Sequence, residues 1–472
     1  MTEPLADAIS ERCRKTCAVV GVGVSNLPLI RFLRAHGARV TARDRKTAQE
    51  LGSIADELTA LGVSTRLGAD YLDDLSEEVI FRSPGLRPDL PAFLEAVDRG
   101  AQLTSEMEWF LECTPATVIG VTGSDGKTTT TTLTYLFLEE ERLRRGGGNV
   151  YVGGNIGEPL LPYVERMTEA DIAVVELSSF QLQTMRVSPA RVAITNLSPN
   201  HLDWHRDMTE YIAAKTNIFR HKGCKRLVLN AENDLTAALA KTSSVPVALF
   251  SSAGKPVGAE KSVYEKDGWI MLDNGITARG ILRADEIRVP GRHNLENFMT
   301  AIALTDGLVS PESIGTVAER FRGVAHRMER IRTVGGVTYY NSSIDSTPTR
   351  TAAALAAFGD MGIRPIVICG GYDKHIPFAP LAEALAKYAK AAVLTGATAQ
   401  AIAQAIRECP AANGLPVLLE SDFHRAVETA KDFAQSGDTV LLSPACASFD
   451  AFRNFAERGE TFRAIVERFP EM

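Results

Sequence analysis

The chain lacks the features that mark membrane, secreted and nucleic-acid-binding proteins. Its seven cysteines form no Cys-x-x-Cys pair, which argues against a disulfide framework or a cysteine zinc site and favours reduced cytoplasmic thiols. No apolar run is long enough to span a bilayer, and residues 1–15 lack the apolar core of a signal peptide. Basic and acidic residues are interspersed at a net charge of -7, so no nucleic-acid surface is expected. These absences predict a cytoplasmic protein with small-molecule partners.

Length and composition predict an ordinary globular protein of several domains. The chain has 472 residues, 45% hydrophobic and 23% charged, and such a length corresponds to about three domains. We find no internal repeat. Two changes in pattern, near residues 113–115 and 321–324, give the expected domain limits: 1–113, 114–323 and 324–472.

Short Val/Ile/Leu runs alternate with amphipathic stretches along the chain, and this alternation is typical of parallel α/β sheets. In such sheets ligands gather beyond the carboxyl ends of the strands. Residues 262–290, with Asp-Gly and Asn-Gly turns, predict a small antiparallel hairpin region. The predicted strands are residues 17–22, 39–42, 79–81, 117–121, 172–176, 192–196, 226–230, 366–369, 391–394 and 439–442.

The most informative segment is a glycine turn between a predicted strand and a helix, residues 120–129. Backbone amides of such a turn close on an anion, Lys127 adds a positive charge, and Thr128 or Thr129 can ligate Mg2+. Val121 stands where the strict pattern requires glycine, so the loop is a variant; the alternative is a structural turn with a solvated lysine. The residues predicted to bind ATP here are Gly123, Ser124, Asp125, Gly126, Lys127, Thr128 and Thr129.

A second glycine turn, Gly21 to Asn26, follows the first predicted strand. Its third glycine is replaced by Asn26, so pyrophosphate binding, an NAD site and a structural turn all stay open. Arg43 and Arg45 close the next strand, and two basic residues there favour a phosphorylated ligand over a bare ribose.

Three residues of the middle third are candidates for the chemistry. Glu176 ends an apolar strand and can bind Mg2+. His201 follows the next strand, beside Asp203, where a ligand role competes with a structural one. Lys215 lies on a helix that begins near Asp207, and pattern alone favours a solvated lysine there.

These residues form motifs that resemble those of the Mur ligases over essentially the whole chain. Two of the motifs, those at 176–182 and 443–450, resemble the glutamate-adding members; the alternatives are another Mur ligase or a folylpolyglutamate synthase. An NAD-dependent oxidoreductase or a non-catalytic nucleotide switch would leave most of these motifs without a purpose. The motifs are TGSDGKT at 122–128, GGNIG at 153–157, ELSSFQL at 176–182, NHLD at 200–203, AK at 214–215, GRHNLEN at 291–297, HR at 326–327, SPACASFD at 443–450 and RNF at 453–455.

The resemblance implies three α/β domains: a Rossmann-like N-terminal domain, a central P-loop ATPase domain with a parallel sheet, and a Rossmann-like C-terminal domain. It also implies a cytoplasmic, monomeric ligase of peptidoglycan precursor synthesis, which serves cell shape and division. Such an enzyme transfers the ATP γ-phosphoryl group to the carboxylate of UDP-N-acetylmuramoyl-L-alanine. The amine of D-glutamate then attacks the acyl phosphate.

The resemblance also assigns roles by position. Lys127, His201 and Lys215 would be catalytic; two Mg2+ ions would be held by Thr128, Glu176, His201 and Lys215, the last as a CO2-derived carbamate. Asn294, Asn297 and Arg327 would contact ATP. The substrate contacts would be Ser25, Ser83, Asn155, Ser346, Lys374, Ser448 and Phe455 through its backbone N-H, with Lys374 supplying the cation for glutamate.

One block departs from the form common in the family. An aspartate for the ATP ribose is Ser342 here, and a lysine is Ile344. Asp345, three positions on from Ser342, is a candidate to compensate.

Overall fold

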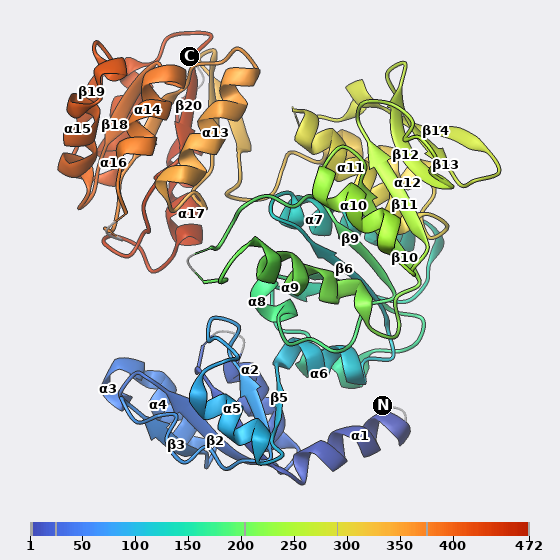
Figure 1. Ribbon diagram of the computed structural model, residues 1–472. Helices are drawn as coiled ribbons and strands as arrows, with labels where there is room; N and C mark the ends of the chain where they lie inside the picture. The colour runs from blue at the N-terminus through green and yellow to red at the C-terminus, as the bar shows by residue number, and fades with distance from the viewer. Residues whose placement is uncertain (1–2, 24–25, 203, 290, 374–375, 471–472) are drawn as a thin grey trace. The chain divides into compact units, whose positions relative to one another are not determined.

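The computed structural model describes residues 3–23, 26–202, 204–289, 291–373 and 376–470. The chain divides into two compact units, Met1–Arg320 and Phe321–Met472. The first unit contains two sheets and the second contains one, which confirms the predicted α/β class with three domains (Figure 1). The two units part close to the predicted boundary after residue 323, and the three sets of domain limits remain predictions.

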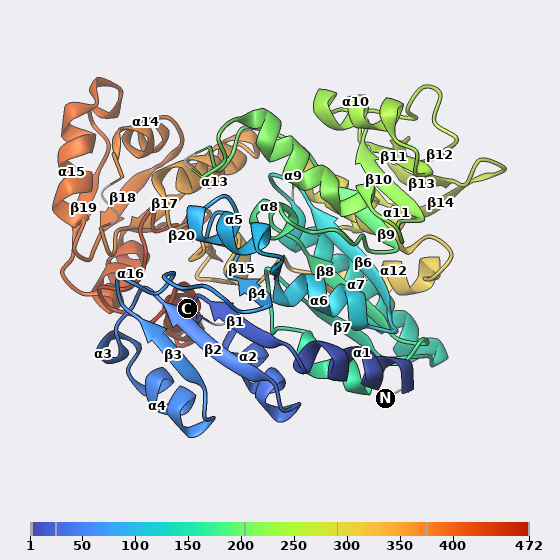
Figure 2. The same ribbon diagram turned by 60° about the horizontal axis from the view of Figure 1, so that its bottom comes forward.

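The N-terminal sheet has five parallel strands in the order β3-β2-β1-β4-β5. Figure 2 shows β1, β2, β3 and β4 of this sheet. Alternate residues of β1 face two cores: Cys17 and Val19 join one, and Ala18 and Val20 join the other, which includes Phe93. The strands are β1 Thr16–Val20, β2 Arg39–Asp44, β3 Ser64–Leu67, β4 Val79–Arg82 and β5 Gln102–Thr104. The helices are α1 Glu3–Cys13, α2 Asn26–Ala35, α3 Ala48–Leu51, α4 Ser53–Ala60, α5 Pro91–Asp98 and α6 Glu106–Cys113.

The central sheet has nine strands in the order β14-β13-β12-β11-β10-β9-β6-β8-β7. The strands from β12 to β14 are antiparallel, and Asp267 and Gly268 both have positive φ in their first turn, as the Asp-Gly pair predicts. The other neighbours are parallel. The strands are β6 Thr117–Thr122, β7 Val150–Gly154, β8 Ile172–Glu176, β9 Arg191–Ile194, β10 Arg226–Asn230, β11 Val247–Ser251, β12 Lys261–Lys266, β13 Trp269–Asp273 and β14 Ala278–Arg283.

The helices of the central domain pack against one another in two sets. α11 and α12 pack against α7, and α8 packs against α9 (Figure 1). Asp207 caps α9 and accepts a hydrogen bond from the backbone N of Glu210 at 2.8 Å, as its position before the helix predicts. The helices are α7 Lys127–Arg145, α8 Ser179–Leu182, α9 Met208–Arg220, α10 Asp234–Thr242, α11 Arg292–Thr305 and α12 Pro311–Arg320, with 3-10 turns η1 Leu161–Arg166 and η2 Ala284–Glu286.

The second unit contains a six-stranded sheet in the order β15-β16-β20-β17-β18-β19, parallel except for β15. Val367 and Cys369 of β17 face one core, while Ile366 and Ile368 face another. The strands are β15 Glu329–Val334, β16 Val337–Asn341, β17 Ile366–Cys369, β18 Ala391–Leu394, β19 Val417–Leu419 and β20 Thr439–Leu442. The helices are α13 Pro348–Asp360, α14 Ala379–Tyr388, α15 Ala399–Glu408, α16 Phe423–Phe433 and α17 Phe455–Glu467, with η3 Pro410–Ala412.

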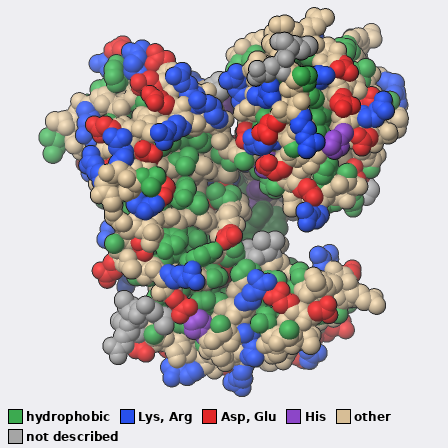
Figure 3. Space-filling view, turned by 180° about the vertical axis from the view of Figure 1, so that it is seen from behind, with side chains coloured by type: hydrophobic (Ala, Val, Ile, Leu, Met, Phe, Trp, Pro, Cys, Tyr) green, Lys and Arg blue, Asp and Glu red, His purple; other side chains and the backbone are tan. Residues whose placement is uncertain are grey.

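Two surface properties bear on the function. Among the residues that the structure describes, no helix combines the length and the apolar character needed to span a bilayer. On the face seen in Figure 3, basic and acidic side chains are interspersed.

Candidate active site

Residues 123–126 connect β6 to α7, and we call them the phosphate loop. Close approaches of neighbouring residues require its two glycines. Gly123 has φ +150°, and a Cβ there would lie 1.9 Å from Thr195 Oγ1. Gly126 caps α7 with φ +75°, and a Cβ there would lie 2.4 Å from Asn297 Oδ1. A Cβ at Gly123 would therefore require Thr195 to move, and a Cβ at Gly126 would require the Asn297 side chain to move.

The segment after β9 holds the loop in place. Ser124 Oγ accepts a hydrogen bond from Ser198 N at 2.9 Å and lies 2.9 Å from the hydroxyl of Tyr211. Asp125 N donates to Asn196 Oδ1 at 2.9 Å. These bonds keep the loop ordered at the carboxyl end of β6, so that the N-H groups at the start of α7 are preorganised for an anion.

Two lysines converge on the same loop. Lys127 Nζ donates to the carbonyls of Gly123 and Ser124, each at 2.9 Å. The side chain of Lys215, which is 2% exposed, donates to Gly123 O at 2.8 Å and to Thr122 Oγ1 at 3.2 Å. Burial, and then the positive charge of Lys127, hold the pKa of Lys215 well below its usual range. Lys215 is therefore not the solvated lysine that pattern alone favours, and its surroundings favour the neutral amine over the ammonium.

Glu176 lies buried at the strand end where the sequence predicts a metal ligand. It ends β8 beside Val121 of β6 and is 1% exposed. Its Oε1 accepts a hydrogen bond from Asn155 Nδ2 at 2.7 Å, while its buried Oε2 has no hydrogen-bond partner. A buried carboxylate oxygen without a partner is costly, and a hard cation satisfies it. The donor set at this strand end therefore fits Mg2+.

His201 lies on the connection that follows β9. It adopts a positive φ of 54°, and its ring meets the ring of Phe180 edge-on at 4.8 Å. Asp203, its predicted neighbour, lies outside the described residues. Within the described part of the chain no three His, Cys, Asp or Glu side chains are arranged to hold a metal by themselves. Mg2+ requires few protein carboxylates when phosphate oxygens complete its shell.

The remaining predicted ATP contacts of the first unit lie on α7 and α11. Thr128 and Thr129 are buried in the first turn of α7. Asn297 is buried on α11, and its Oδ1 accepts a hydrogen bond from Thr130 Oγ1 at 3.2 Å. Asn294 lies in the first turn of α11. The fold therefore brings Asn297 to the phosphate loop, and the adenine contact of both asparagines remains a prediction.

The other predicted ATP residues lie in the second unit. Arg327 follows the buried His326. Burial raises the pKa of Asp345, and the positive charge of Arg327 acts in the opposite direction. Ser443 Oγ donates to Asp345 Oδ2 at 2.9 Å. Ser342 Oγ accepts a hydrogen bond from the backbone N of Met328 at 3.1 Å. Asp345 therefore lies near Arg327, and the Ser342 side chain contacts both the backbone and the Asp345 carboxylate.

The predicted glutamate contacts lie on loops at the carboxyl ends of the second unit's strands. Ser346 follows β16, the buried Ser448 follows β20, and Phe455 begins α17. Lys374 lies outside the described residues. Gly371 follows β17, and a Cβ there would lie 2.2 Å from Ala447 O, so the loops after β17 and β20 are in close contact.

Sequence reasoning missed Arg458, which joins these loops. This residue is 2% exposed on α17. It donates to Ser343 Oγ at 3.0 Å, to Ser343 O at 2.9 Å, to Ala447 O at 3.0 Å and to Cys446 O at 3.1 Å. Only its place next to the last motif could have suggested a role, because an arginine at this position of a helix is usually solvated.

The N-terminal domain contributes a turn built on close packing. A Cβ on Gly21, which has φ +87°, would lie 2.7 Å from Ser83 Cβ, so the predicted substrate residue Ser83 lies against the first glycine turn. Ser25 lies outside the described residues. Arg43 is 3% exposed and is paired with Glu77 at 3.1 Å, so the expected ligand-facing role for Arg43 is wrong. Asp44 instead closes the turn by accepting a hydrogen bond from Val22 N at 2.7 Å.

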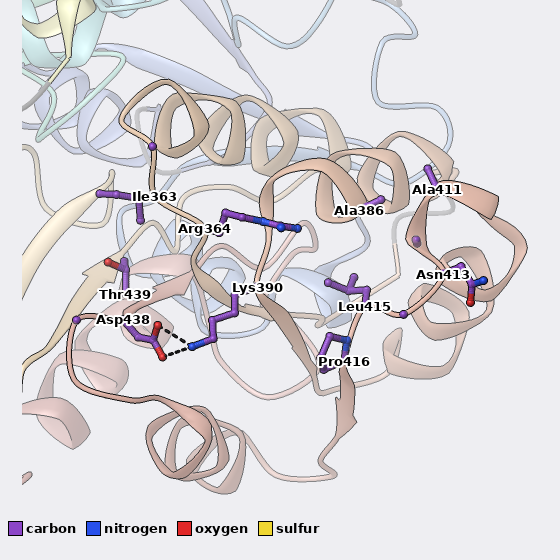
Figure 4. Close-up of a pocket in the computed structure, with 14 residues that line it drawn as sticks. Ile363, Arg364, Ala386, Lys390, Ala411, Asn413, Leu415, Pro416, Asp438 and Thr439 are labelled. Atoms are coloured by element: carbon purple, nitrogen blue, oxygen red, sulfur yellow. Dashed lines mark hydrogen bonds and ion pairs between the residues drawn. The ribbon is translucent and has the colours of Figure 1, made fainter.

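A cavity of about 550 Å³ lies elsewhere in the second unit (Figure 4). Arg364, Lys390, Pro416 and Asp438 line it, each just before a strand, and Lys390 is paired with Asp438 at 2.6 Å. The cavity is therefore at the amino edge of the sheet, away from the predicted glutamate loops.

Comparisons with known proteins cover most of the chain. Residues 15–105 match the Mur ligase MurD-like N-terminal domain, residues 121–305 the Mur ligase middle domain, and residues 326–446 the Mur ligase glutamate ligase domain. A protein of Clostridium novyi named UDP-N-acetylmuramoylalanine–D-glutamate ligase is 46% identical over 96% of both chains. A protein of Acetivibrio thermocellus with the same name is 43% identical over 99% of both.

Solved structures with low identity share the fold. UDP-N-acetylmuramate-alanine ligase MurC of Thermotoga maritima has a TM-score of 0.54 at 18% identity, covering 96% of this chain and 99% of its own. MurF of Acinetobacter baumannii has a TM-score of 0.57 at 16% identity, covering 98% of both.

Proposed function

This chain belongs to the Mur ligase family, and from that premise we propose that it joins D-glutamate to UDP-N-acetylmuramoyl-L-alanine while ATP is converted to ADP and phosphate. The observation that carries the proposal is the buried Glu176 carboxylate, whose unpartnered oxygen lies at the strand end beside the phosphate loop. Such a site prepares a cation to meet a triphosphate.

The first step is phosphoryl transfer. A carboxylate oxygen of the L-alanine attacks the γ-phosphorus, the bond from that phosphorus to the ADP oxygen breaks, and an acyl phosphate forms. The backbone N-H groups at the start of α7 and the ammonium of Lys127 bind the phosphates. Hydrogen bonds from Ser124 N and Asp125 N to Asn196 hold the loop, and Lys127 is held against the carbonyls of Gly123 and Ser124. Glu176 and Thr128 would hold one Mg2+ and His201 would contribute to a second position, and the bound ions would supply charge neutralisation.

Lys215 is the proposed site of carbamylation. Its neutral amine, favoured by burial and by the charge of Lys127, attacks CO2, and loss of a proton leaves a carbamate. The modification replaces a cation with an anionic oxygen donor. Lys215 then contributes to the second metal position, and Tyr211, whose ring lies 4.8 Å from Nζ, helps to fix the side chain.

The second step forms the amide. The amine of D-glutamate attacks the acyl carbon, the bond from that carbon to the phosphate oxygen breaks, and the nitrogen loses a proton as inorganic phosphate leaves. We assign the glutamate carboxylates to Lys374, Ser346, Ser448 and the backbone N-H of Phe455. The dicarboxylic acceptor explains why a cation and several neutral donors are expected together.

We place the reaction in the cytoplasmic synthesis of peptidoglycan precursors and expect the enzyme to act as a monomer that supports cell shape and division. The test uses the purified chain with ATP, Mg2+, UDP-N-acetylmuramoyl-L-alanine and a panel of acceptors. D-Glutamate should yield ADP and a nucleotide product extended by one residue. Another amino acid as the preferred acceptor would assign the chain to a different Mur ligase activity, and ADP without a product would refute ligation.

A further inference from the structure

Two segments that are distant in the sequence meet inside the first compact unit. The turn after β4, residues 83–89, belongs to the N-terminal domain and carries Ser83. Residues 204–210 belong to the central domain, follow His201 and lead into α9. Because hydrogen bonds and ion pairs join the two segments, the proposed sugar-nucleotide side and the proposed metal side are in direct contact.

The first connection is made by Trp204. Its indole Nε1 donates to Gly85 O at 3.0 Å. The guanidinium of Arg87 lies 5.1 Å from the centre of the Trp204 ring and donates to the Trp204 carbonyl. A cation over an aromatic face adds attraction to the hydrogen bonds, so Trp204 is held from both ends.

The second connection is a charge network around Arg87. Its guanidinium contacts Asp89 at 2.8 Å and Glu210 at 3.0 Å. Arg206 is also paired with Asp89. Asp89 lies on the N-terminal side and Glu210 in the first turn of α9, so one planar fork joins both domains. We call Arg87, Asp89, Trp204 and Glu210 the latch.

A buried arginine continues the connection toward His201. Arg82 is 1% exposed and donates to the carbonyls of Ser83, at 3.2 Å, and of Phe180, at 3.0 Å. The Phe180 ring lies 4.8 Å from that of His201 and 4.7 Å from that of Trp204. Contacts therefore run without a break from the Ser83 turn to the His201 ring.

We propose that the latch has a positioning role. Arg87 and Trp204 hold the Ser83 turn at a fixed position relative to the His201 segment, so that the substrate carboxylate is aligned for phosphoryl transfer. This inference rests on the function proposed above and adds positioning residues to it. In this role Arg87 and Trp204 act through the segments that they join. Alignment matters because a displacement of about 1 Å costs roughly 10²-fold in rate.

The kinetic test compares Arg87→Ala, Arg87→Lys and Trp204→Phe with the control Arg66→Ala. Arg66 lies in the same domain, is 53% exposed and is paired only loosely with Asp74 at 3.8 Å. We expect Arg87→Ala to lower kcat for ADP release roughly 10- to 100-fold at an unchanged Kd for ATP. Arg87→Lys should retain part of the rate, because it keeps the charge but loses the fork, and Arg66→Ala should behave as wild type.

A second measurement needs no turnover. Binding of UDP-N-acetylmuramoyl-L-alanine should slow hydrogen exchange of amides 204–210 in the wild type and in Arg66→Ala, but much less in Arg87→Ala. Equal rates and equal protection in the Arg87 and Trp204 variants and the control would overturn the latch. If Arg87→Ala does not fold, Arg87→Lys and Trp204→Phe decide by the same criteria. A wild-type chain that binds the nucleotide but forms no product would overturn the proposed function, while the exchange comparison still decides the latch.

Discussion

At the scale of single residues, the phosphate loop is surrounded by charges whose burial determines their chemistry. Lys127 and Lys215 both donate to Gly123 O, and the repulsion between them adds to the burial that lowers the pKa of Lys215. Glu176 is buried with only one of its oxygens hydrogen-bonded. Burying each of these charged groups lowers the stability of the fold. We therefore expect substitutions here to change stability and activity in opposite directions.

Glu176→Gln should make the protein more stable and less active. The amide keeps the shape and the contact with Asn155 but removes a buried charge, so Tm should rise. Loss of the carboxylate should lower kcat roughly 10²-fold or more and raise the Mg2+ concentration needed. Glu158→Gln, at an exposed glutamate, is the matched control. Unchanged Mg2+ dependence would remove Glu176 from the metal site.

Lys215→Ala should be nearly inactive, with partial rescue by short-chain carboxylic acids that replace the carbamate. Lys215→Arg should be inactive and resist rescue, because a guanidinium stays charged. At limiting CO2, activity of the wild type should fall as the pH drops through the lowered pKa of Lys215, since protonation removes the nucleophilic amine. Full activity of untreated Lys215→Ala would contradict the assignment.

At the scale of secondary-structure elements, the loops after strands carry the site and the helices fix the loops. α11 lies so close to the phosphate loop that Gly126 has no room for a Cβ beside Asn297. α6 plays a similar part between the first two domains: Glu106 accepts a hydrogen bond from Leu161 N at 3.1 Å, and Glu108 accepts one from Arg186 N at 2.7 Å. The two acids tie the helix to the central domain.

Gly123→Ala should abolish ATP binding and lower Tm, because the new Cβ meets Thr195 Oγ1 at 1.9 Å and φ is unfavourable for alanine. Gly315→Ala is the contrasting control, since Gly315 lies within α12 with nothing inside 4 Å. Helix propensity should stabilise that variant by up to about 1 kcal/mol. Calorimetric titration with ATP and thermal unfolding measure both effects, and retained ATP affinity in Gly123→Ala would contradict the loop assignment.

Glu106→Gln should change how stability depends on pH. Burial raises the pKa of Glu106 to about 7 from 4.5, so the folded protein holds a proton that the unfolded chain loses. Its contribution is complete below pH 4.5 and is lost as pH rises through 7, by about 3 kcal/mol. Glu106→Gln mimics the protonated acid and should flatten this decline in urea unfolding. The exposed Glu95→Gln should keep the wild-type slope, and a parallel decline in both variants would exclude Glu106 as its source.

The sequence predicts the elements well where burial is continuous. All ten predicted strands occur, because apolar runs in parallel sheets are buried on both faces. Seven strands of the described residues were missed. Five of them, β3, β5, β7, β15 and β19, are edge strands, and the other two are the inner strands β11 and β16. β9 ends at Ile194, short of the predicted residue 196, because Thr195 and Asn196 bind the phosphate loop with their side chains.

The site residues also divide into those that the sequence could predict and those that it could not. The position of Glu176 at a strand end could be predicted because topology alone brings such ends together. Arg87 and Arg458 could not be, because their partners lie far along the chain and local patterns favour solvated arginines. The prediction for Arg43 was wrong for the same reason. A basic residue at a strand end resembles a ligand contact, and the local sequence does not reveal that Glu77 is its partner.

At the scale of the whole molecule, each of the two compact units has hydrophobic cores of its own. The cores around β17 consist only of residues of the second unit, among them Leu355 and Val440. We therefore expect residues 321–472, produced alone, to fold cooperatively, as judged by circular dichroism and a single thermal transition. Leu441→Asp in that fragment should prevent folding. A wild-type fragment without a transition would show that its stability depends on the first unit.

The cavity at the amino edge of the C-terminal sheet has a pharmacological consequence. Its lining, including Lys390 and Asp438, shares no residue with the proposed contacts for ATP, sugar nucleotide or glutamate. An inhibitor acting from there would not be outcompeted by rising substrate levels. Resistance to it would arise through changes in ordinary structural positions and would leave the catalytic motifs intact.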